Sequence, residues 1–207
     1  MHYSSDAIEQ LEQGRQEVFN ELRALYVDLA SKLEPTLTCE KAREYISHGV
    51  CRRLRIMQQC IENVFALFPP EKRSLLTEDE RINVEISLHA FLINTHGVPD
   101  SLAWAYVHER GIEINPIKVG LFQKDFQRLH LPPEVVSYLD GSVSLWHKNY
   151  AKNYRDGLAH RIPPYLPPAI LTDAHREELQ NLETRREQAI EDQNLELALE
   201  LEEAKKA

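Results

Sequence analysis

Apolar residues recur every three or four positions along most of the chain, which is the spacing of amphipathic α-helices. The apolar positions of the first such segment are Ile8, Leu11, Val18, Leu22, Leu25 and Leu29. They predict a helix over residues 6–32, and Pro35 follows its end. Asp6 is expected to cap its amino end, because Glu9 follows at the spacing of a capping box. This helix should bury one face.

Two further helices are predicted in the first half of the chain. One covers residues 39–67 and stops before a pair of prolines, which cannot continue a helix. The next begins at the sequence TEDE, where Thr77 stands three residues before a glutamate at capping-box spacing. Pro99 is expected to kink or restart this helix, which then continues to a stop at Gly111.

The second half begins with a stretch that shows no helical period. Residues 112–131 are expected to be irregular, either as a loop or with one short strand. Pro133 then stands at an early position that a helix tolerates, so a helix is predicted from there to His160. Gly141 is expected to break it, because glycine is a poor helix former.

The last predicted helix runs from Thr172 or Asp173 to about Lys205. It is rich in Glu, Gln and Arg, and its leucines hold no strict heptad, so a mostly solvated helix is expected. The whole pattern predicts an all-α fold: an antiparallel helical bundle of four to five long helices with an extra C-terminal helix. The bundle would occupy residues 1–171, and the charged helix residues 172–207.

Composition narrows the class of protein. No apolar run approaches the roughly 20 residues of a transmembrane helix, and the amino end lacks the basic-then-apolar order of a signal peptide. None of the three cysteines, Cys39, Cys51 and Cys60, forms a CxxC pair, so neither a disulfide framework nor a zinc ribbon is expected. We therefore expect a cytoplasmic protein that does not insert into a membrane.

Charge is distributed unevenly along the chain. The net charge of −9 argues against a dedicated nucleic-acid binder. Residues 173–207 hold 11 acidic and 5 basic side chains, so much of this negative charge lies in the tail. The segment 147–161 has the opposite character: Asp156 is its one acidic residue among Lys148, Lys152, Arg155 and Arg161.

Arg155 and His160 stand five residues apart at the end of a predicted helix, just before four prolines. On a regular helix they are separated by about 140° around the axis, so a shared site requires the long arginine to curl towards the histidine. The planar guanidinium can hold a phosphate, and the imidazole can move a proton near neutral pH. When a ribose 2′-hydroxyl attacks its own phosphate, the reaction requires phosphate binding and proton transfer but no metal.

The sequence Arg155-Asp156-Gly157-Leu158-Ala159-His160 resembles the R-x4–6-H motif of the HEPN superfamily (higher eukaryotes and prokaryotes nucleotide-binding domains). The resemblance implies an α-helical bundle and a metal-independent endoribonuclease that dimerises so that two motifs form one active site. Many members belong to toxin–antitoxin or antiviral defence systems. One subgroup has a tyrosine two residues after the histidine, where Ile162 stands here, so modification by a partner nucleotidyltransferase is not expected.

Roles follow from this resemblance. His160 would handle the 2′-hydroxyl proton, and Arg155 would hold the scissile phosphate. The residues expected to orient or bind the RNA substrate are Lys152, Asn153, Asp156 and Arg161. No metal or other cofactor is predicted, because His89, His96 and His108 show no paired ligand pattern.

A structural interpretation of the same residues stays open. Arg155 can pair with a carboxylate, and His160 can sit at a helix carboxyl end, where positive charge is favourable. The chain would then be a non-catalytic helical interaction protein whose acidic C-terminal helix docks a protein partner.

Other conspicuous residues are expected to be structural. The proline segment should act as a stiff strap that lays Tyr165, Leu166 and Ile170 over the bundle. Arg52, Arg53 and Arg55 should form a solvated helix face. Aromatic anchors for the core or for a homodimer interface are expected at Trp104, Tyr106 and Trp146.

Overall fold

The computed structural model describes residues 3–72, 74–166, 173–192 and 194–204, and every regular element in these ranges is helical. This confirms the all-α fold. No helix in the described ranges combines the length and apolar character that crossing a membrane requires.

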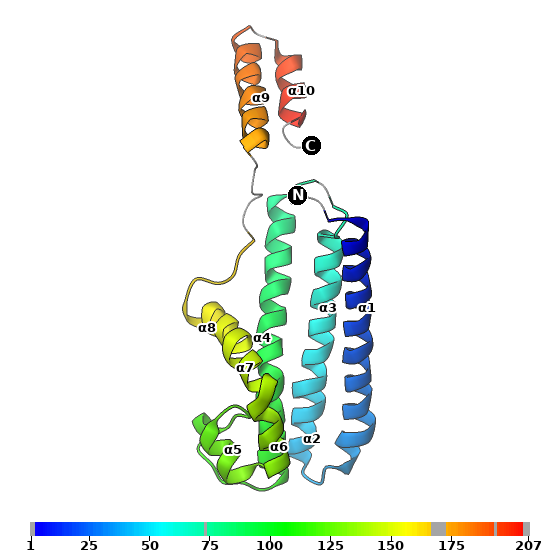
Figure 1. Ribbon diagram of the computed structural model, residues 1–207, viewed down its shortest axis with the longest axis vertical. Helices are drawn as coiled ribbons and strands as arrows, with labels where there is room; N and C mark the ends of the chain where they lie inside the picture. The colour runs from blue at the N-terminus through cyan, green and yellow to red at the C-terminus, as the bar shows by residue number, and fades with distance from the viewer. Residues whose placement is uncertain (1–2, 73, 167–172, 193, 205–207) are drawn as a thin grey trace.

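Three long helices stand side by side and alternate in direction: α1 (Ser5–Asp28), α3 (Arg52–Leu67) and α4 (Glu78–Glu109) (Figure 1). The turn after α1 consists of a π-helical segment, a 3-10 segment, the short helix α2 and a second π-helical segment that runs into α3. Their bounds are Leu29–Leu33, Glu34–Thr36, Glu40–Glu44 and Tyr45–Cys51. The antiparallel bundle predicted from the helical pattern is therefore present.

The second half of the chain turns below α4 and returns beside it (Figure 1). Its helices are α5 (Lys124–His130), α6 (Pro133–Tyr138), α7 (Ser144–Trp146) and α8 (Lys152–His160). A 3-10 turn precedes α5 and π-helical turns flank α7, at Pro116–Lys118, Leu139–Val143 and His147–Ala151. The predicted break at Gly141 is confirmed, because its φ and ψ of −81° and −140° are not helical.

The prediction that residues 112–131 are irregular was wrong for α5. This helix has seven residues, too few to be stable by local propensity alone. Phe126 anchors it, because its fully buried ring packs against Ala103 and Val107 of α4. The missed helix is thus a consequence of tertiary packing. The rest of the segment 112–131 forms turns and the 3-10 element, with no strand.

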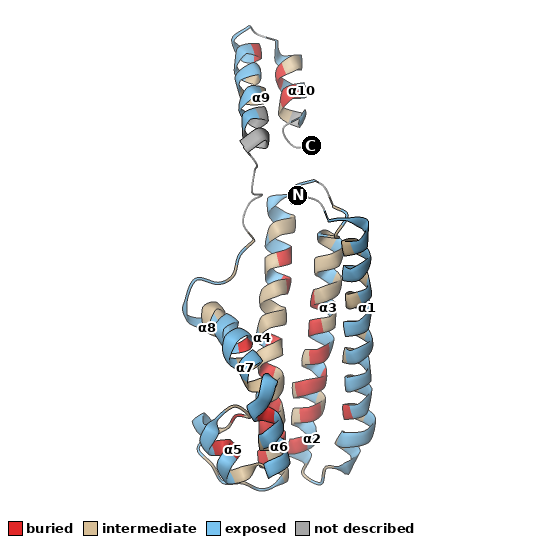
Figure 2. Cartoon of the chain, in the orientation of Figure 1, coloured by how far each residue is buried: buried red, intermediate tan, exposed pale blue. Residues whose placement is uncertain are grey.

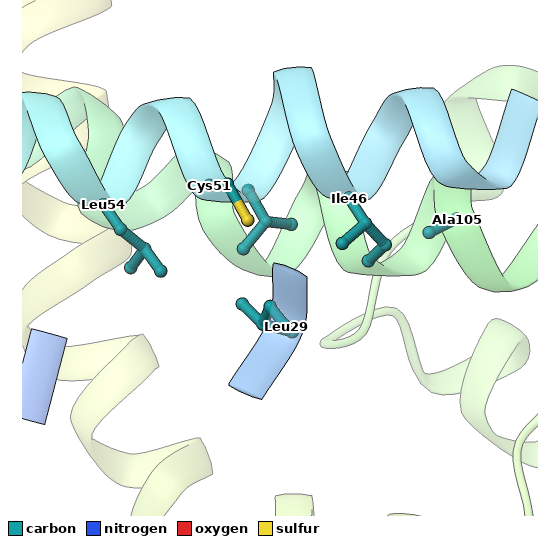
Figure 3. Close-up of a cluster of buried hydrophobic side chains, with 6 residues drawn as sticks. Leu29, Ile46, Cys51, Leu54 and Ala105 are labelled. Atoms are coloured by element: carbon teal, nitrogen blue, oxygen red, sulfur yellow. The ribbon is translucent and has the colours of Figure 1, made fainter. Parts of the chain in front are cut away.

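The main core lies where the segment 40–67 meets α1 and α4, and the buried residues of Figure 2 gather there. Its buried members, most of them visible in Figure 3, are Leu29, Ile46, Val50, Cys51, Leu54 and Ala105. Helix α1 contributes less than its pattern predicted: no residue of Ser5–Asp28 is buried, and Leu11, Val18 and Leu25 are exposed. Only one side of α1 is covered, which leaves much of its apolar stripe open.

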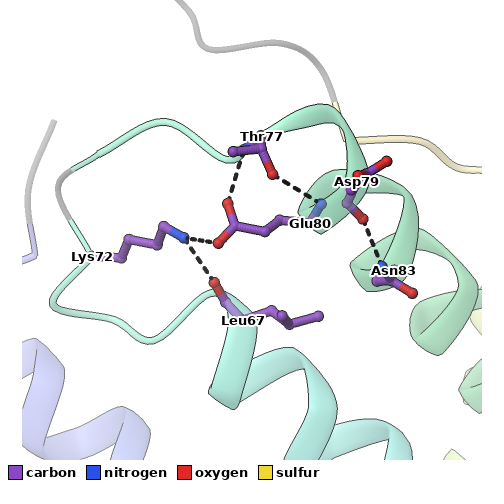
Figure 4. Close-up of polar contacts among 6 residues, drawn as sticks. All are labelled: Leu67, Lys72, Thr77, Asp79, Glu80 and Asn83. Carbon is purple, nitrogen blue, oxygen red and sulfur yellow. Dashed lines mark hydrogen bonds and ion pairs between the residues drawn. The ribbon is translucent and has the colours of Figure 1, made fainter. Parts of the chain in front are cut away.

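Helix ends agree largely with the sequence signals. Thr77 and Glu80 form the predicted capping box at the start of α4, and Lys72 ties Glu80 to the Leu67 carbonyl at the end of α3 (Figure 4). At the other end of α4, Gly111 adopts the left-handed conformation with φ of 58°, as its role as helix stop requires. Ser4, and not Asp6, caps α1, since its hydroxyl accepts the Ala7 N–H.

Pro99 neither ends nor restarts its helix, and α4 is a single element of 32 residues. An internal proline removes one backbone hydrogen bond and costs about 3 kcal/mol. Packing on both sides offsets this cost, because α4 contacts α3 on one side and α8 on the other.

The predicted single C-terminal helix is in fact two, α9 (Asp173–Glu191) and α10 (Leu195–Ala204), which pack against each other. Asn194 separates them. Its N–H donates to the Ala189 carbonyl five residues back, while its side chain accepts the Leu197 N–H and so caps α10. Buried Ala189, Ala198 and Leu201 form the contact between the two helices. The proposed domain boundary lies within residues 167–172, outside the described residues, and stays a prediction.

Candidate functional site

A cleft of about 560 Å³ lies between α4, the loop before α5 and the helical run that ends in α8. Each of these three walls contributes a different kind of side chain. Helix α4 supplies a histidine, a carboxylate and an indole, the loop supplies a phenyl ring, and the last run supplies a histidine and cations. We describe this cleft as the candidate site because it contains part of the R-x4-H helix.

The α4 wall consists of His96, Asp100 and Trp104, which recur at intervals of four residues and so share one side of the helix. Asp100 Oδ2 lies 3.4 Å from His96 Nδ1, a distance that suits an ion pair when the imidazole is protonated. His96 is mostly covered, with 17% of its side chain exposed, whereas Asp100 is 55% exposed. Trp104 completes the wall with a flat apolar surface.

The loop wall is made by residues 119–123, which follow the 3-10 turn. Phe122 stacks on His147, with ring centroids 3.6 Å apart and an angle of 8° between the ring planes. Gln127 fixes this loop from α5, because its side-chain amide donates to the Leu121 carbonyl at 2.6 Å. One face of His147 is thereby shielded from water.

The third wall combines His147 and Lys148 of the π-helical turn with Lys152 and Arg155 of α8. The i→i+5 bonding of a π turn brings residues five apart to about the same side, which favours a common direction for His147 and Lys152. Lys148, Lys152 and Arg155 then follow at helical intervals of four and three. Cations thus line one side of the cleft.

Two pKa shifts describe the electrostatics of the cleft. Burial lowers the pKa of His147, and the charges of His96 and Lys152 lower it further against the opposing effect of Asp100. The neutral imidazole is therefore favoured. The hydrogen bond from Arg155 Nη1, 2.9 Å long, lowers the pKa of Asp156, with help from the charge of Lys152. Because Arg155 uses one donor for this neighbour, its other donors are available to a ligand.

The cleft brings together three of the six residues selected from sequence: Lys152, Arg155 and Asp156. Asn153 points elsewhere and donates to the Asn149 carbonyl of its own helix at 3.0 Å. His160 is the exposed last residue of α8, and exposed Arg161 follows it; neither lines the cleft. Arg155 has a carboxylate partner, as the structural interpretation expected, yet it also faces the cleft.

The chain after His160 is held along α4 by polar contacts. His89 Nε2 donates to the Pro164 carbonyl at 2.6 Å, and the Leu166 N–H donates to Glu85 Oε1 at 2.9 Å. Of the residues that the strap was expected to lay over the bundle, Leu166 is half-buried, whereas Tyr165 is 65% exposed and does not pack. Ile170 lies outside the described residues. The strap is therefore anchored through its backbone.

The remaining sequence expectations had mixed outcomes. Arg52 and Arg55 are exposed as predicted, but Arg53 turns towards α4 and donates to Asn94 Oδ1 at 3.0 Å. Tyr106 is half-buried and donates to the His130 carbonyl, whereas Trp146 is exposed. Among the described residues, no group of three or more His, Cys, Asp or Glu side chains is placed to hold a metal ion.

Sequence reasoning did not assemble the histidine pair and aromatic wall of this cleft. A signal existed in the four-residue spacing of His96, Asp100 and Trp104 and in the spacing of Lys148, Lys152 and Arg155. Nothing local links these two stripes to each other or to Phe122, because they come together only in the folded chain. Comparisons with protein-family models, with curated proteins and with solved structures find no match for this chain.

Proposed function

We propose that this protein is a metal-independent endoribonuclease of the HEPN type and that RNA is cut at the cleft. One observation carries the proposal: Arg155 of the R-x4-H helix lines a cleft together with Lys148 and Lys152. Cations that converge on one space suit the phosphates of a nucleic acid, and a guanidinium can hold two phosphate oxygens at once.

The opposite wall supports a nucleotide as the ligand. Trp104 presents an aromatic ring to the same space, and stacking on aromatic side chains is the common way in which proteins hold unpaired RNA bases. Both carboxylates of the cleft have cationic or imidazole neighbours, Asp156 at Arg155 and Asp100 at His96, which moderates their repulsion of a phosphate. The site is thus suited to a single-stranded segment.

We further propose that the active form is a homodimer. Trp146, Tyr150 and Tyr154 recur at four-residue intervals on the run that carries the motif, and all three are exposed. Large aromatic side chains of this kind are the usual anchors of protein interfaces. A contact between two copies at these residues would place two α8 helices near one axis. Tyr150→Glu is expected to shift sedimentation towards the monomer.

The experiment that tests the nuclease is cleavage of a random-sequence RNA pool in EDTA. The wild-type chain should cut it and leave 2′,3′-cyclic phosphate ends, the product of attack by the 2′-hydroxyl. Arg155→Lys should lower the rate by about 100-fold or more, because the ammonium keeps the charge but loses the planar fork.

Arg128→Lys is the matched control. Arg128 also contacts a nearby aspartate, at 3.4 Å from Asp125, but does not line the cleft. It should leave the cleavage rate unchanged. Absence of cleavage by the wild-type chain would contradict the proposal, and so would equal cleavage by all three proteins.

A second candidate function has its own observation. The α9–α10 hairpin has a small buried contact, and it leaves three apolar side chains exposed: Ile190, Leu195 and Leu199. Exposed apolar side chains on an otherwise charged hairpin suit a protein partner. The test is the double variant Leu195→Asp, Leu199→Asp in a complex of this chain with a purified protein partner. If the wild-type chain cuts no RNA and the double variant no longer forms that complex, the protein is a non-catalytic interaction protein.

A further inference from the structure

Two histidines line the cleft, and neither belongs to the R-x4-H motif. His96 comes from the middle of α4, and His147 comes from the π-helical turn before α8. The motif histidine, His160, is exposed at the end of α8 and is not part of the lining. Arg155, which would hold the phosphate, therefore shares the cleft with His96 and His147 and not with the motif histidine.

The two imidazoles are close to each other. Their ring centroids are 5.5 Å apart, and the ring planes are inclined by 39°. Both residues are half-buried, so neither ring is an ordinary surface histidine. At this separation both rings can reach oxygens of one phosphodiester, while Lys152 and Arg155 lie on the same side as His147.

The environments of the two rings differ in the way that acid–base catalysis requires. Asp100 Oδ2 stands 3.4 Å from His96 Nδ1, a distance at which the carboxylate can pair with a proton-bearing nitrogen and orient the ring. Phe122 covers a face of His147 and reduces its hydration, which favours its neutral form. The other charged groups at the cleft are Lys148, Lys152, Arg155 and Asp156, all from the element that carries His147 or the helix that follows it. One ring is thus suited to donate a proton and the other to accept one.

We propose that His147 and His96 are the general base and the general acid of RNA cleavage in this chain, with Asp100 as the positioning residue behind His96. This inference rests on the proposed ribonuclease function. It differs from the expectation drawn from the motif, which gives the proton transfer to His160.

The step balances without a metal or a second substrate. Neutral His147 takes the proton of the 2′-hydroxyl, and the 2′-oxygen forms a bond to phosphorus. The bond from phosphorus to the 5′-oxygen breaks, and protonated His96 gives its proton to that leaving oxygen. Arg155 and Lys152 hold the non-bridging oxygens. The products are a 2′,3′-cyclic phosphate and a 5′-hydroxyl, and water later exchanges the protons of the two histidines.

The test compares His147→Gln, His96→Gln and His160→Gln with the wild-type full-length chain on the random-sequence RNA pool in EDTA. Loss of a general acid or base lowers rates by about 10²–10⁴-fold. His147→Gln and His96→Gln should each lower kcat by about 100-fold or more with little change in KM, whereas His160→Gln should stay within about threefold of the wild type.

The pH profile gives a readout that a structural role would not move. The wild-type rate should be bell-shaped, with an acidic limb from His147 and an alkaline limb from His96. His147→Gln should lose the acidic limb, and His96→Gln should lose the alkaline limb. Asp100→Asn should lower kcat less than His96→Gln does, because Asp100 orients the ring at 3.4 Å but transfers no proton itself.

Phe122→Leu separates packing from chemistry, because it removes the ring stack on His147 and keeps the imidazole. Because burial lowers the pKa of His147, this variant should move the acidic limb of the pH profile to higher pH. Thermal unfolding of each variant checks that it is folded.

Two outcomes overturn the inference in distinguishable ways. If the wild-type chain cuts the pool, His160→Gln abolishes cleavage, and His147→Gln and His96→Gln cut normally, the nuclease stands and the histidine pair is not catalytic. If the wild-type chain cuts nothing, the proposed function fails and the inference fails with it.

Discussion

Helix α4 shows two contrasting sides. Towards α3 and the π-helical segment before it, α4 presents small or buried residues that allow close approach: Asn94, Gly97, Ser101 and Ala105. Towards α8 and the loop it presents His96, Asp100 and Trp104, which surround an open cleft. One helix thus serves both as a packing element and as the wall of a site. We therefore expect the first side to determine stability and the second side to carry the proposed chemistry.

The α3 side is tightly constrained. A Cβ atom at Gly97 would lie 2.5 Å from the guanidinium of Arg53, and one at Gly49 would lie 3.1 Å from Ser101. Glycine at these places lets a side chain from the facing helix lie against the backbone. On the cleft side, in contrast, the ion pairs of Asp100 with His96 and of Asp156 with Arg155 are partly exposed. Substitutions on the two sides should therefore have different consequences.

The largest loss of stability is expected at the core of the α3 side. Ile46 is 1% exposed, so Ile46→Ala leaves a cavity and should lower the free energy of unfolding by about 2–5 kcal/mol. Ile56 of α3 is 38% exposed, and Ile56→Ala should cost about 1 kcal/mol or less. Urea denaturation of both variants measures the difference. Equal losses would show that this side is not the stabilising one.

A smaller loss is expected where a charge is held in the same interface. Asn94→Ala removes the acceptor that Arg53 Nη1 uses at 3.0 Å and leaves a half-buried guanidinium without it. The expected cost is about 1–3 kcal/mol. Asn83→Ala, on the exposed start of α4, is the control and should change stability by less than about 0.5 kcal/mol. Similar melting of the two variants would contradict a structural role for this contact.

A hydrogen-bonded carboxylate at the carboxyl end of α4 should make the stability of the fold depend on pH. Glu109 accepts hydrogen bonds from the Thr38 and Cys39 N–H groups before α2, and these bonds lower its pKa below the ordinary value of 4.5. A carboxyl with a lowered pKa stabilises the fold above the unfolded value, and this contribution disappears as pH falls through the folded value. As pH is lowered from 5, the wild type loses this contribution, whereas Glu109→Gln has none to lose. The thermal unfolding midpoint of the variant should therefore decrease less than that of the wild type. Glu113→Gln, an exposed control, should behave as the wild type does.

The smallest loss of stability is expected at the cleft. Arg155 is 44% exposed on the side chain, and ion pairs of this kind contribute little. Arg155→Lys should change the free energy of unfolding by less than about 0.5 kcal/mol, as measured by urea denaturation, even though cleavage is expected to fail. A loss of several kcal/mol would instead assign Arg155 to the fold and would erase the contrast between the two sides of α4.

Local rules predicted those features whose causes lie within a few residues. The capping box at Thr77 and Glu80, the left-handed stop at Gly111 and the break at Gly141 all follow from backbone chemistry that neighbouring residues determine. The same rules missed α5, because Phe126 is held by α4 and not by its own segment. They misplaced the cap of α1 as well, since several adjacent residues could accept the same N–H group.

The sequence by itself determined the helical class, the long helices and the cationic character of α8, because periodicity and charge are properties of the chain. Only the tertiary structure decided which of these residues meet. His96, Phe122 and His147 are far apart along the chain, and their ring contacts depend on how α4, the loop and the π-helical turn pack. His160 stands only five residues after Arg155 in the motif, yet the two do not share the cleft. Helix α8 ends at His160, and His89 and Glu85 hold the residues that follow it along α4.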